Sequence, residues 1–478
     1  MRSIWSDDEP RILAANDELP EMAEVVIIGG GIAGLLCALL LKESGVRAIV
    51  LEAEEICSGQ TKNTTAKITS QHGAIYDKLT QSFGEEIAGK YGRMNQDAID
   101  EYERIIKERN IACGFRRLPA FLYTKTENGI GQLERERTAA KKAGLPVSVV
   151  YETELPFEIK MALKFDGQAE FHPLEFINGI AGELDICEHT RVVKIDGHSV
   201  ITERGALNAE KIVIATHFPF VNFPGFYFAK MHQERSYVVA GTVGSVGMSE
   251  TVKSTRKLKN TGTAENAETT DKKSDILNGV YYGIDTDSLS IRSIGNTILV
   301  GGMGHRTGVK QTGNPYDVLR KRAERLWPDF REVAVWSAQD CMTLDSLPYV
   351  GTFSRGRSDW YVMTGFGKWG MSNSMAAAMV IRDLIIGKSN PYQEAVSPQR
   401  HWSGVAVKAL AKEMGFTVKN FVTLKGPRCP HLGCRLEWNK YEKTWDCPCH
   451  GSRFQESGIL IDNPAQNNAA IQSGVKDE

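Results

Sequence analysis

The residues VVIIGGGIAGLLCALLLK, at positions 25–42, decide the fold of this chain. The first four are apolar and uncharged, which predicts a strand buried on both faces, and positions 35–42 predict a helix. Gly29, Gly31 and Gly34 lie between them in the spacing G-x-G-x-x-G, which permits a tight turn and lets a phosphate approach the backbone. The run approaches the length of a membrane span, but three consecutive glycines at its centre favour a strand, a turn and a helix.

A second apolar strand is predicted at positions 47–51, directly before Glu52, where a ribose hydroxyl is expected. Strand, glycines, helix, strand and acid in this order predict a dinucleotide site, with the pyrophosphate at the amino terminus of the helix. NAD and FAD share this pattern, so the pattern alone does not choose between them.

The continuation ICSGQTKNTTAK, at positions 56–67, resembles the segment after the acid in the D-amino-acid oxidase and glycine oxidase (DAO) family of flavoproteins. In that family the segment runs under the FAD pyrophosphate and the flavin ring, whereas the alternative is an ordinary Thr-rich loop. Positions 190–193 resemble the strand that lays its backbone against adenine. Positions 211–216 resemble the strand that ends in Ala-Thr-Gly, although His217 replaces the glycine here.

The family's last flavin-binding block is matched by positions 336–351 and 364–371, followed by a predicted helix at 371–386. The resemblance therefore implies FAD as a cofactor. Some relatives bind flavin covalently, but neither Cys57 nor Cys341 lies at the corresponding offset, so we expect non-covalent binding. The FAD contacts it implies, together with the glycine motif and the acid, are Gly29, Gly31, Ile32, Ala33, Gly34, Glu52, Ser58, Gly59, Thr64, Thr65, Val192, Ala215, Gly365, Trp369, Gly370 and Met371.

Two loops near the carboxyl end, CPHLGC at 429–434 and CPCHGS at 447–452, each offer one thiolate and one imidazole. Sets of two Cys and two His usually bind zinc, but a one-residue gap between Cys and His and a second cysteine in each loop are not zinc-finger spacing. In a Rieske [2Fe-2S] centre two Cys hold one iron and two His hold the other. The candidate ligands are Cys429, His431, Cys447 and His450.

These loops closely resemble those of Rieske proteins, and the resemblance implies further roles. Cys434 and Cys449 correspond to the disulfide that clamps the two loops in Rieske proteins of cytochrome bc complexes. Ser452 lies where the family places a hydroxyl that bonds a bridging sulfide. Phe454 stands where high-potential members carry a Tyr that donates to a cysteine sulfur.

Together the two resemblances identify a DAO-type flavoprotein of bacterial type fused to a Rieske domain, of fold class α/β. We expect a discontinuous Rossmann-like FAD-binding domain at 1–115, 166–230 and 328–400, with an inserted α+β substrate domain at 116–165 and 231–327. Polar residues 248–275 predict a disordered insertion. A linker helix at 401–416 and a small all-β Rieske domain at 417–478 follow, and the short stretch before Cys429 predicts an abbreviated supporting sheet.

Composition narrows the partners and the location. The net charge of -2 does not favour polyanions, so nucleic acid is not an expected partner. Four of the nine cysteines lie at 429–449 and the rest are scattered, a pattern typical of cytoplasmic proteins with one local redox site. The amino terminus has no signal-peptide layout, and no transmembrane segment is expected.

Catalytic residues do not stand out, because a neutral amine can lose a hydride to flavin without a strong base. Four weak candidates are His72, His305, Arg306 and Lys368. His72 follows the flavin loop and faces either the ring or a structural partner. Arg306 offers a fork for a carboxylate, or is a surface arginine on a turn. Lys368 is a cation for the reduced ring or a solvated side chain.

The resemblance leaves three functions open. In the first, FAD oxidises an amine or amino-acid-like small molecule by hydride transfer, and the cluster relays electrons to an external one-electron acceptor, either a protein or a quinone. In the second, the chain is an electron-transfer reductase module without amine oxidation. In the third, it is an oxidase that uses oxygen and whose cluster is structural. Two cofactors on one chain favour the first.

Overall fold

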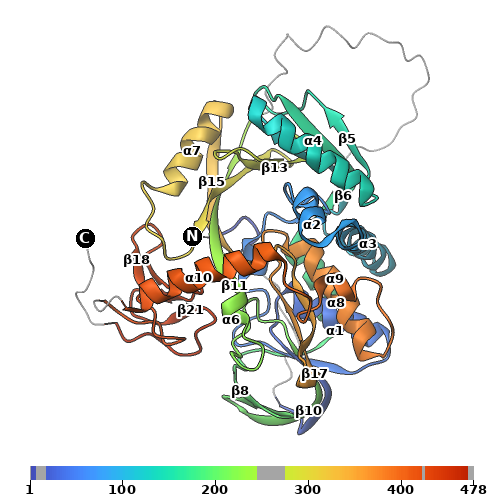
Figure 1. The fold of residues 1–478 in the computed structure, drawn as a ribbon, viewed down its shortest axis with the longest axis vertical. Helices are drawn as coiled ribbons and strands as arrows, with labels where there is room; N and C mark the ends of the chain where they lie inside the picture. The colour runs from blue at the N-terminus through green and yellow to red at the C-terminus, as the bar shows by residue number, and fades with distance from the viewer. Residues whose placement is uncertain (1, 7–17, 245–274, 423–425, 472–478) are drawn as a thin grey trace.

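The computed structural model describes residues 2–6, 18–244, 275–422 and 426–471 (Figure 1). The predicted insertion at 248–275 lies outside the described residues except for its last position. The described chain forms three sheets with helices packed on them. Among the residues described, none of the helices combines the length and the apolarity needed to cross a membrane.

The first sheet has eight strands and is built around the strand predicted at position 25. Its strands are β1 (Met22–Ile28), β2 (Ala48–Leu51), β7 (Asp185–Cys187), β8 (Val192–Asp196), β9 (Ser199–Thr202), β10 (Gly205–Ile214), β16 (Tyr349–Ser354) and β17 (Arg357–Thr364). β1 lies between β10 and β2, parallel to both. A strand flanked on both sides and covered on both faces must be apolar throughout, as Val25 to Ile28 are.

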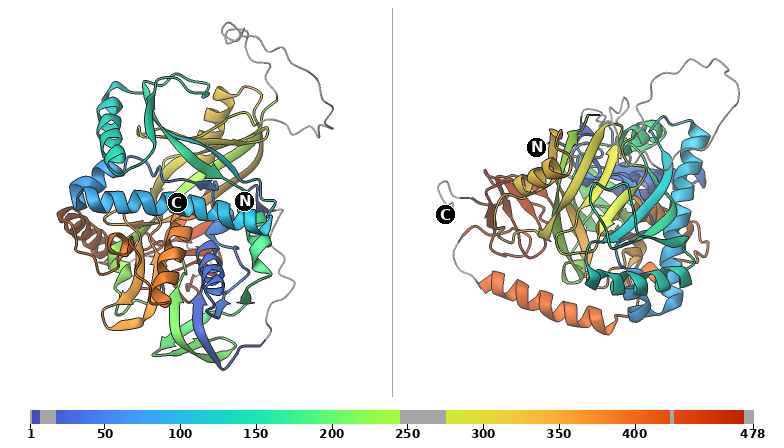
Figure 2. Two further views of the ribbon diagram at one scale, coloured as in Figure 1. Left: turned by 90° about the vertical axis from the view of Figure 1, so that its right-hand side faces the viewer. Right: turned by 90° about the horizontal axis from the view of Figure 1, so that it is seen from above.

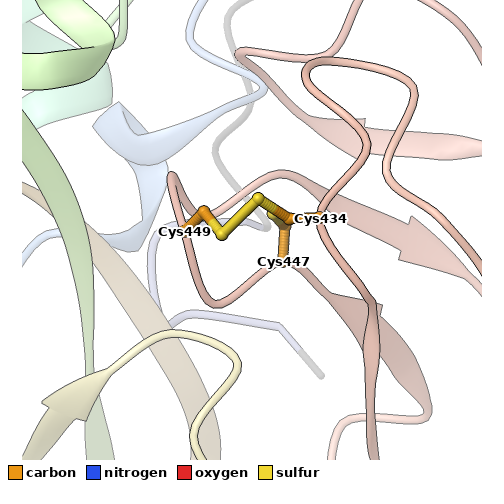
Figure 3. A group of neighbouring side chains, drawn as sticks. All are labelled: Cys434, Cys447 and Cys449. Atoms are coloured by element: carbon orange, nitrogen blue, oxygen red, sulfur yellow. A yellow bond between two sulfur atoms is a disulfide. The ribbon is translucent and has the colours of Figure 1, made fainter. Parts of the chain in front are cut away.

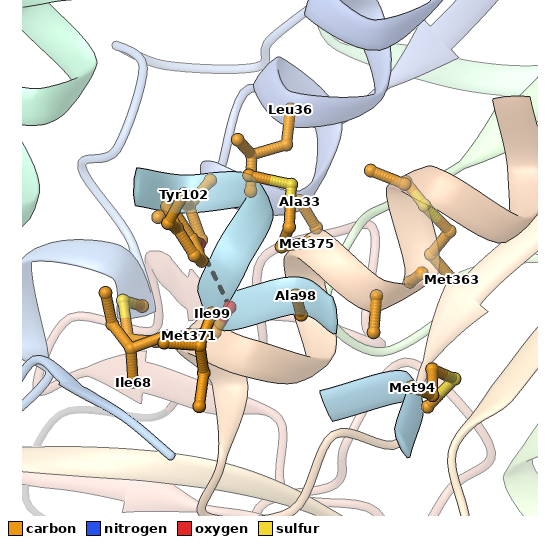
Figure 4. Close-up of a cluster of buried hydrophobic side chains, with 14 of the residues drawn as sticks. Ala33, Leu36, Ile68, Met94, Ala98, Ile99, Tyr102, Met363, Met371 and Met375 are labelled. Carbon is orange, nitrogen blue, oxygen red and sulfur yellow. Dashed lines mark hydrogen bonds between the residues drawn. The ribbon is translucent and has the colours of Figure 1, made fainter. Parts of the chain in front are cut away.

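Two helices pack on this sheet, and a third packs on one of them. α1 (Ile32–Glu43) packs against α8 (Gly370–Ile385), and the long α3 (Glu85–Arg109) lies across α8. Figure 4 shows Leu36, Ala98 and Met375 from these three helices meeting in one buried cluster. In the same cluster the Tyr102 hydroxyl donates to the Met371 carbonyl at 3.0 Å, which ties α3 to the start of α8.

The second sheet has nine strands and contains the segments that we expected to form a substrate domain. Its strands are β3 (Lys67–Ile68), β4 (Arg116–Thr124), β5 (Val147–Val150), β6 (Met161–Glu170), β11 (Met231–Thr242), β12 (Val280–Gly283), β13 (Ser290–Ile294), β14 (Thr297–Arg306) and β15 (Arg331–Thr343). β15 pairs with β11, so it lies in this sheet although sequence analysis placed residues 328–400 in the FAD-binding domain. α4 (Glu127–Lys142) and α7 (Pro315–Leu326) pack on the sheet.

Shorter helices connect these layers: η2 (Gln60–Asn63), α2 (Tyr76–Phe83), α5 (Pro173–Ala181), α6 (Tyr227–Lys230) and α9 (Gln393–Val396). η2 contacts β15, so the loop that follows Glu52 spans from the first sheet to the second. The space between the two sheets is therefore bordered by that loop.

The C-terminal domain is a four-stranded sheet of β18 (Glu437–Asn439), β19 (Thr444–Asp446), β20 (Arg453–Gln455) and β21 (Leu460–Asp462). Every strand of this sheet follows the first cysteine loop. The preceding helix, α10 (Gly404–Val422), extends past position 416, where we expected the linker helix to end. Figures 1 and 2 show this domain beside β11 and β15.

Candidate functional site

A cavity of about 1380 Å³ lies where the parallel strands of the first sheet end. Ile28 ends β1, Leu51 ends β2, and Ala215 directly follows β10, and all three line the cavity. Ligands of open α/β sheets bind at this edge, outside the carboxyl ends of the strands. The second sheet and the C-terminal domain supply the remaining walls.

The glycines at the start of α1 lie in tightly packed surroundings, with one exception. Gly29 has a φ of 112° and a Cβ there would lie 2.7 Å from the Ala215 carbonyl oxygen, while a Cβ on Gly34 would lie 2.0 Å from the Gly29 carbonyl oxygen. At Gly31 the nearest atom would be 3.4 Å away, so this glycine leaves room beside the helix amino terminus. The turn thus combines two packing glycines with one that opens toward the cavity, as a bound pyrophosphate requires.

Glu52 lines the same cavity and is held by the turn. Its carboxylate accepts hydrogen bonds from the Gly30 amide at 2.6 Å and from the Glu54 amide at 3.0 Å. Burial raises the pKa of Glu52, against these hydrogen bonds, which lower it. A carboxylate accepts more bonds than two, so Glu52 retains capacity for a hydroxyl.

The structure brings the predicted FAD contacts together. All of them line the cavity except Gly34 and Gly365. Gly34 packs against the glycine turn, and a Cβ on Gly365, whose φ is 74°, would lie 2.4 Å from Thr343 of β15. These two glycines therefore do not contact the cavity but allow close packing of the segments that line it.

A charged group lies on the wall formed by the second sheet. The Lys368 Nζ atom is 2.9 Å from Asp340 and 3.3 Å from Glu234, and all three residues line the cavity. His232, whose Nε2 atom is 3.7 Å from Glu234 Oε1, and the charge of Lys368 lower the pKa of Glu234 to about 2, although burial opposes the shift. Burial lowers the pKa of Lys368, but Asp340 and Glu234 outweigh it and raise that pKa. Lys368 is thus an ion-paired cation.

The other catalytic candidates lie in different surroundings. His305 lines the cavity and stacks on Tyr237 with ring centroids 5.7 Å apart. His72 does not line it. Its ring is buried, bonds the Tyr91 hydroxyl and the Thr69 carbonyl at 2.6 Å each, and stacks on Trp369. His72 therefore acts as a structural support for Trp369.

Arg306 does not line the cavity either. Its guanidinium donates to the carbonyls of Pro448 and Cys449 at 2.8 Å and pairs with Glu413 of α10 at 2.6 Å. The predicted fork exists, but it holds the second cysteine loop of the C-terminal domain instead of a carboxylate substrate.

Lys67 is a cavity residue that we did not predict from the sequence. It follows the Thr-rich loop at β3, lines the cavity, and donates through Nζ to the Ser290 hydroxyl. Burial, and next the charge of Arg292, lower the pKa of Lys67 to about 7, although Glu170 opposes the shift. The sequence did contain one indication of this role, because Lys67 is the single charged residue between positions 63 and 76.

The cysteine loops form the second site. Cys434 and Cys449 are joined by a disulfide, and the Cys447 sulfur lies beside it (Figure 3). Because disulfide sulfurs carry no thiolate, only Cys447 of these three is available as a metal ligand. Cys447 and Cys429 lie within hydrogen-bonding distance of each other through their side chains.

The same two loops carry two imidazoles that lie close to each other. The rings of His431 and His450 have centroids 5.0 Å apart, and the Nδ1 atom of each is buried without a hydrogen-bond partner in the described part of the chain. The far sides of the rings are held, since His431 Nε2 lies 2.8 Å from Asn222 Oδ1 and His450 lies in hydrogen-bonding range of the Phe228 backbone. Two thiols and two unpaired imidazole nitrogens fit the ligand set of a Rieske cluster.

The two sites share a wall. The Gln233 side chain of β11 donates to the His450 carbonyl at 2.9 Å, and that of Gln339 on β15 donates to the Gly451 carbonyl at 2.7 Å. On the cavity side, Gln60 of η2 donates to Asp462 of β21 at 3.1 Å. Residues of the C-terminal domain that line the cavity are Gln455, Ile459, Leu460, Ile461, Asp462, Asn463 and Gln466.

Comparison with known proteins agrees with this geometry. The family model described as FAD dependent oxidoreductase (DAO) matches residues 24–384, and the model described as Rieske [2Fe-2S] domain matches residues 407–473. YhfW of Bacillus subtilis (strain 168), a putative Rieske 2Fe-2S iron-sulfur protein, is 32% identical over 96% of this chain and 95% of its own length. The α/β fold with a C-terminal Rieske domain is confirmed.

Each half also has more distant relatives. The cytochrome b6-f complex iron-sulfur subunit of Nostoc punctiforme is 41% identical over 51 residues, which is 10% of this chain and 28% of that subunit. Glycine oxidase from Geobacillus kaustophilus has the same fold over 80% of this chain and 100% of its own, with a TM-score of 0.62 at 18% identity.

Proposed function

Because this chain belongs to the DAO family of FAD-dependent oxidoreductases and ends in a Rieske [2Fe-2S] domain, we propose that it oxidises an amine or amino-acid-like substrate and delivers the electrons through the cluster to an external acceptor. FAD and the [2Fe-2S] cluster are its cofactors, as predicted. Bound FAD accepts a hydride from the substrate, and the cluster transfers one electron at a time.

The chain holds FAD along the cavity in this proposal. Gly31 and the amino terminus of α1 take the pyrophosphate, and Glu52 accepts a ribose hydroxyl. Trp369, which stacks on His72, and Met371 at the start of α8 also line the cavity. The other lining residues predicted from the sequence complete the contact set.

The amine group of the substrate would lie against the cavity wall that the second sheet forms. Glu234 and Asp340 carry two negative charges against the single positive charge of Lys368. This wall favours a substrate with a positive group, which suits a protonated amine. The name of the structurally similar glycine oxidase, an enzyme that oxidises an amino acid, supports the same donor class.

The observation that carries the proposed electron route is the shared wall. Cys429, Cys447, His431 and His450 would hold the cluster. The Gln233 side chain joins the His450 backbone to Gln339, which lines the cavity. With both histidine rings turned toward the flavoprotein part, the cluster would receive electrons within one chain. The acceptor would be a one-electron carrier, either a protein or a quinone.

Anaerobic mixing with a panel of amines and amino acids tests this function. We expect one class of substrate to bleach the flavin absorbance and then to produce the electron paramagnetic resonance signal of a reduced Rieske cluster. Glu234→Gln should weaken the binding of that substrate, whereas Glu203→Gln on the surface should not.

Two other outcomes would overturn the proposal. Bleaching by no amine, with reduction by a donor protein instead, would favour a reductase module. Stoichiometric hydrogen peroxide in air, with a cluster that is never reduced, would favour an oxidase.

A further inference from the structure

His217 has a backbone conformation that favours glycine. It follows Thr216 at the end of β10, and its φ is 62°, in the left-handed region. A residue with a Cβ costs roughly 1 kcal/mol or more in this region, so it persists only where its surroundings hold it there. The position therefore retains an imidazole at an energetic cost.

The Rieske domain holds this conformation. The Asn463 Nδ2 atom donates to the carbonyls on both sides of the histidine, at 2.6 Å to Thr216 and 2.7 Å to Phe218. The hydroxyl of Thr364 on β17 donates to the His217 carbonyl. Three hydrogen bonds thus fix three successive residues, and two of the bonds cross between domains.

The ring of His217 lies between the two cofactor sites. It lines the cavity, and its Nε2 atom is buried with no hydrogen-bond partner among the residues that the structure describes. The ring also lies in hydrogen-bonding range of the Gln233 side chain and the Gln339 backbone. Those two glutamines hold the backbones of His450 and Gly451 in the cluster loop.

We propose that His217 positions FAD against the Rieske domain, with its unpaired Nε2 atom forming a hydrogen bond with FAD in the cavity. The inference rests on the proposed route of electrons from flavin to cluster. His217 acts through the placement of FAD, and Asn463 makes that placement depend on the Rieske domain. An unpaired buried polar atom costs free energy, and a polar atom of FAD removes that cost.

His217→Gly is the decisive variant, because glycine suits the left-handed backbone and removes only the ring. We expect its FAD dissociation constant, measured by flavin fluorescence on the apoprotein, to rise about fivefold or more, as for the loss of one hydrogen bond. Stability should stay equal or increase. His217→Gln retains a donor and should bind FAD within about twofold of the unmodified protein.

Asn110→Gly is the matched control. Asn110 is an exposed residue with a φ of 53° at the end of α3, so the substitution relieves the same backbone region far from the cavity. It should change stability alone. An unchanged FAD affinity in His217→Gly, or a fivefold loss in His217→Gln as well, would overturn the proposal.

Photoreduction of the flavin separates this inference from the proposed substrate. Light reduces flavin without an amine, so the rate of subsequent cluster reduction can be followed in every variant. We expect this rate to fall in His217→Gly and in Asn463→Ala and to be unchanged in Asn110→Gly. Rates that stay equal in all variants would contradict the placement role even if an amine substrate is found, and slowed rates would support it even if none is found.

Discussion

Arg235 of β11 and Asp446 of β19 form an ion pair across the interface between the flavoprotein part and the Rieske domain. The Arg235 Nη1 atom lies 2.8 Å from Asp446 Oδ2, and the two side chains are only 1% and 3% exposed. Arg453 reaches the same carboxylate from β20 at 3.5 Å. A charge this deeply buried must remain paired, so the pair makes the relative position of the two parts specific.

Removal of one partner should therefore be costly. We expect Arg235→Met to destabilise the protein by about 3–5 kcal/mol, since it leaves Asp446 buried without its main counter-charge. Lys194→Ala, which removes a pair whose members are 62% and 67% exposed, should cost less than about 1 kcal/mol. Urea unfolding measures both, and equal costs would mean that the interface is open to water.

The three glycines of the turn should respond differently to a side chain. Gly31→Val fills the space left for the pyrophosphate, so we expect a folded protein that purifies without yellow colour. Gly34→Ala forces a Cβ against the Gly29 carbonyl, so we expect lower thermal stability before FAD is added. Flavin content and the melting temperature of the apoprotein distinguish the two, and a fully yellow Gly31→Val protein would contradict the assignment.

These glycines and the cysteine loops were predictable because short spacings encode them. The strand, turn and acid at 25–52 and the loops at 429–452 need only local sequence. The surroundings of His72 and Arg306 were not predictable, because their partners are distant. Arg306 bonds a carbonyl 142 residues away, and His72 bonds Ser372, 300 residues away. Local sequence therefore indicated that these side chains are polar but not which group each one contacts.

Lys67 should make stability depend on pH. Its pKa is about 7 in the folded protein and near 10.5 when exposed. Below pH 7 Lys67 is protonated in both the folded and the unfolded protein, and its buried charge lowers the free energy of unfolding. Between these two values the unfolded chain binds the extra proton, so stability should rise with pH. Lys67→Met should lack this rise in urea unfolding between pH 6 and 9, with Lys194→Met as a control for lost charge, and parallel curves for Lys67→Met and the unmodified protein would contradict it.

The potential of the cluster depends on hydrogen bonds to its sulfurs. The Ala465 amide donates to Ser452 Oγ at 3.0 Å, which leaves the hydroxyl proton free for the neighbouring Cys429 sulfur. Such hydrogen bonds stabilise the reduced cluster and raise its potential, whereas Phe454, fully buried among the four cysteines, offers none. The potential should therefore lie between the limits of about -150 and +300 mV known for Rieske centres.

Ser452→Ala should lower this potential and Phe454→Tyr should raise it, with the exposed Ser148→Ala as a control that leaves it unchanged. Protein-film voltammetry measures all four forms. His431→Cys or His450→Cys should move the potential much further, toward about -400 mV, if a cluster assembles. A potential that neither histidine substitution changes would mean that the two histidines are not ligands. A potential that is unchanged only in Phe454→Tyr would mean that the new hydroxyl points away from the sulfur.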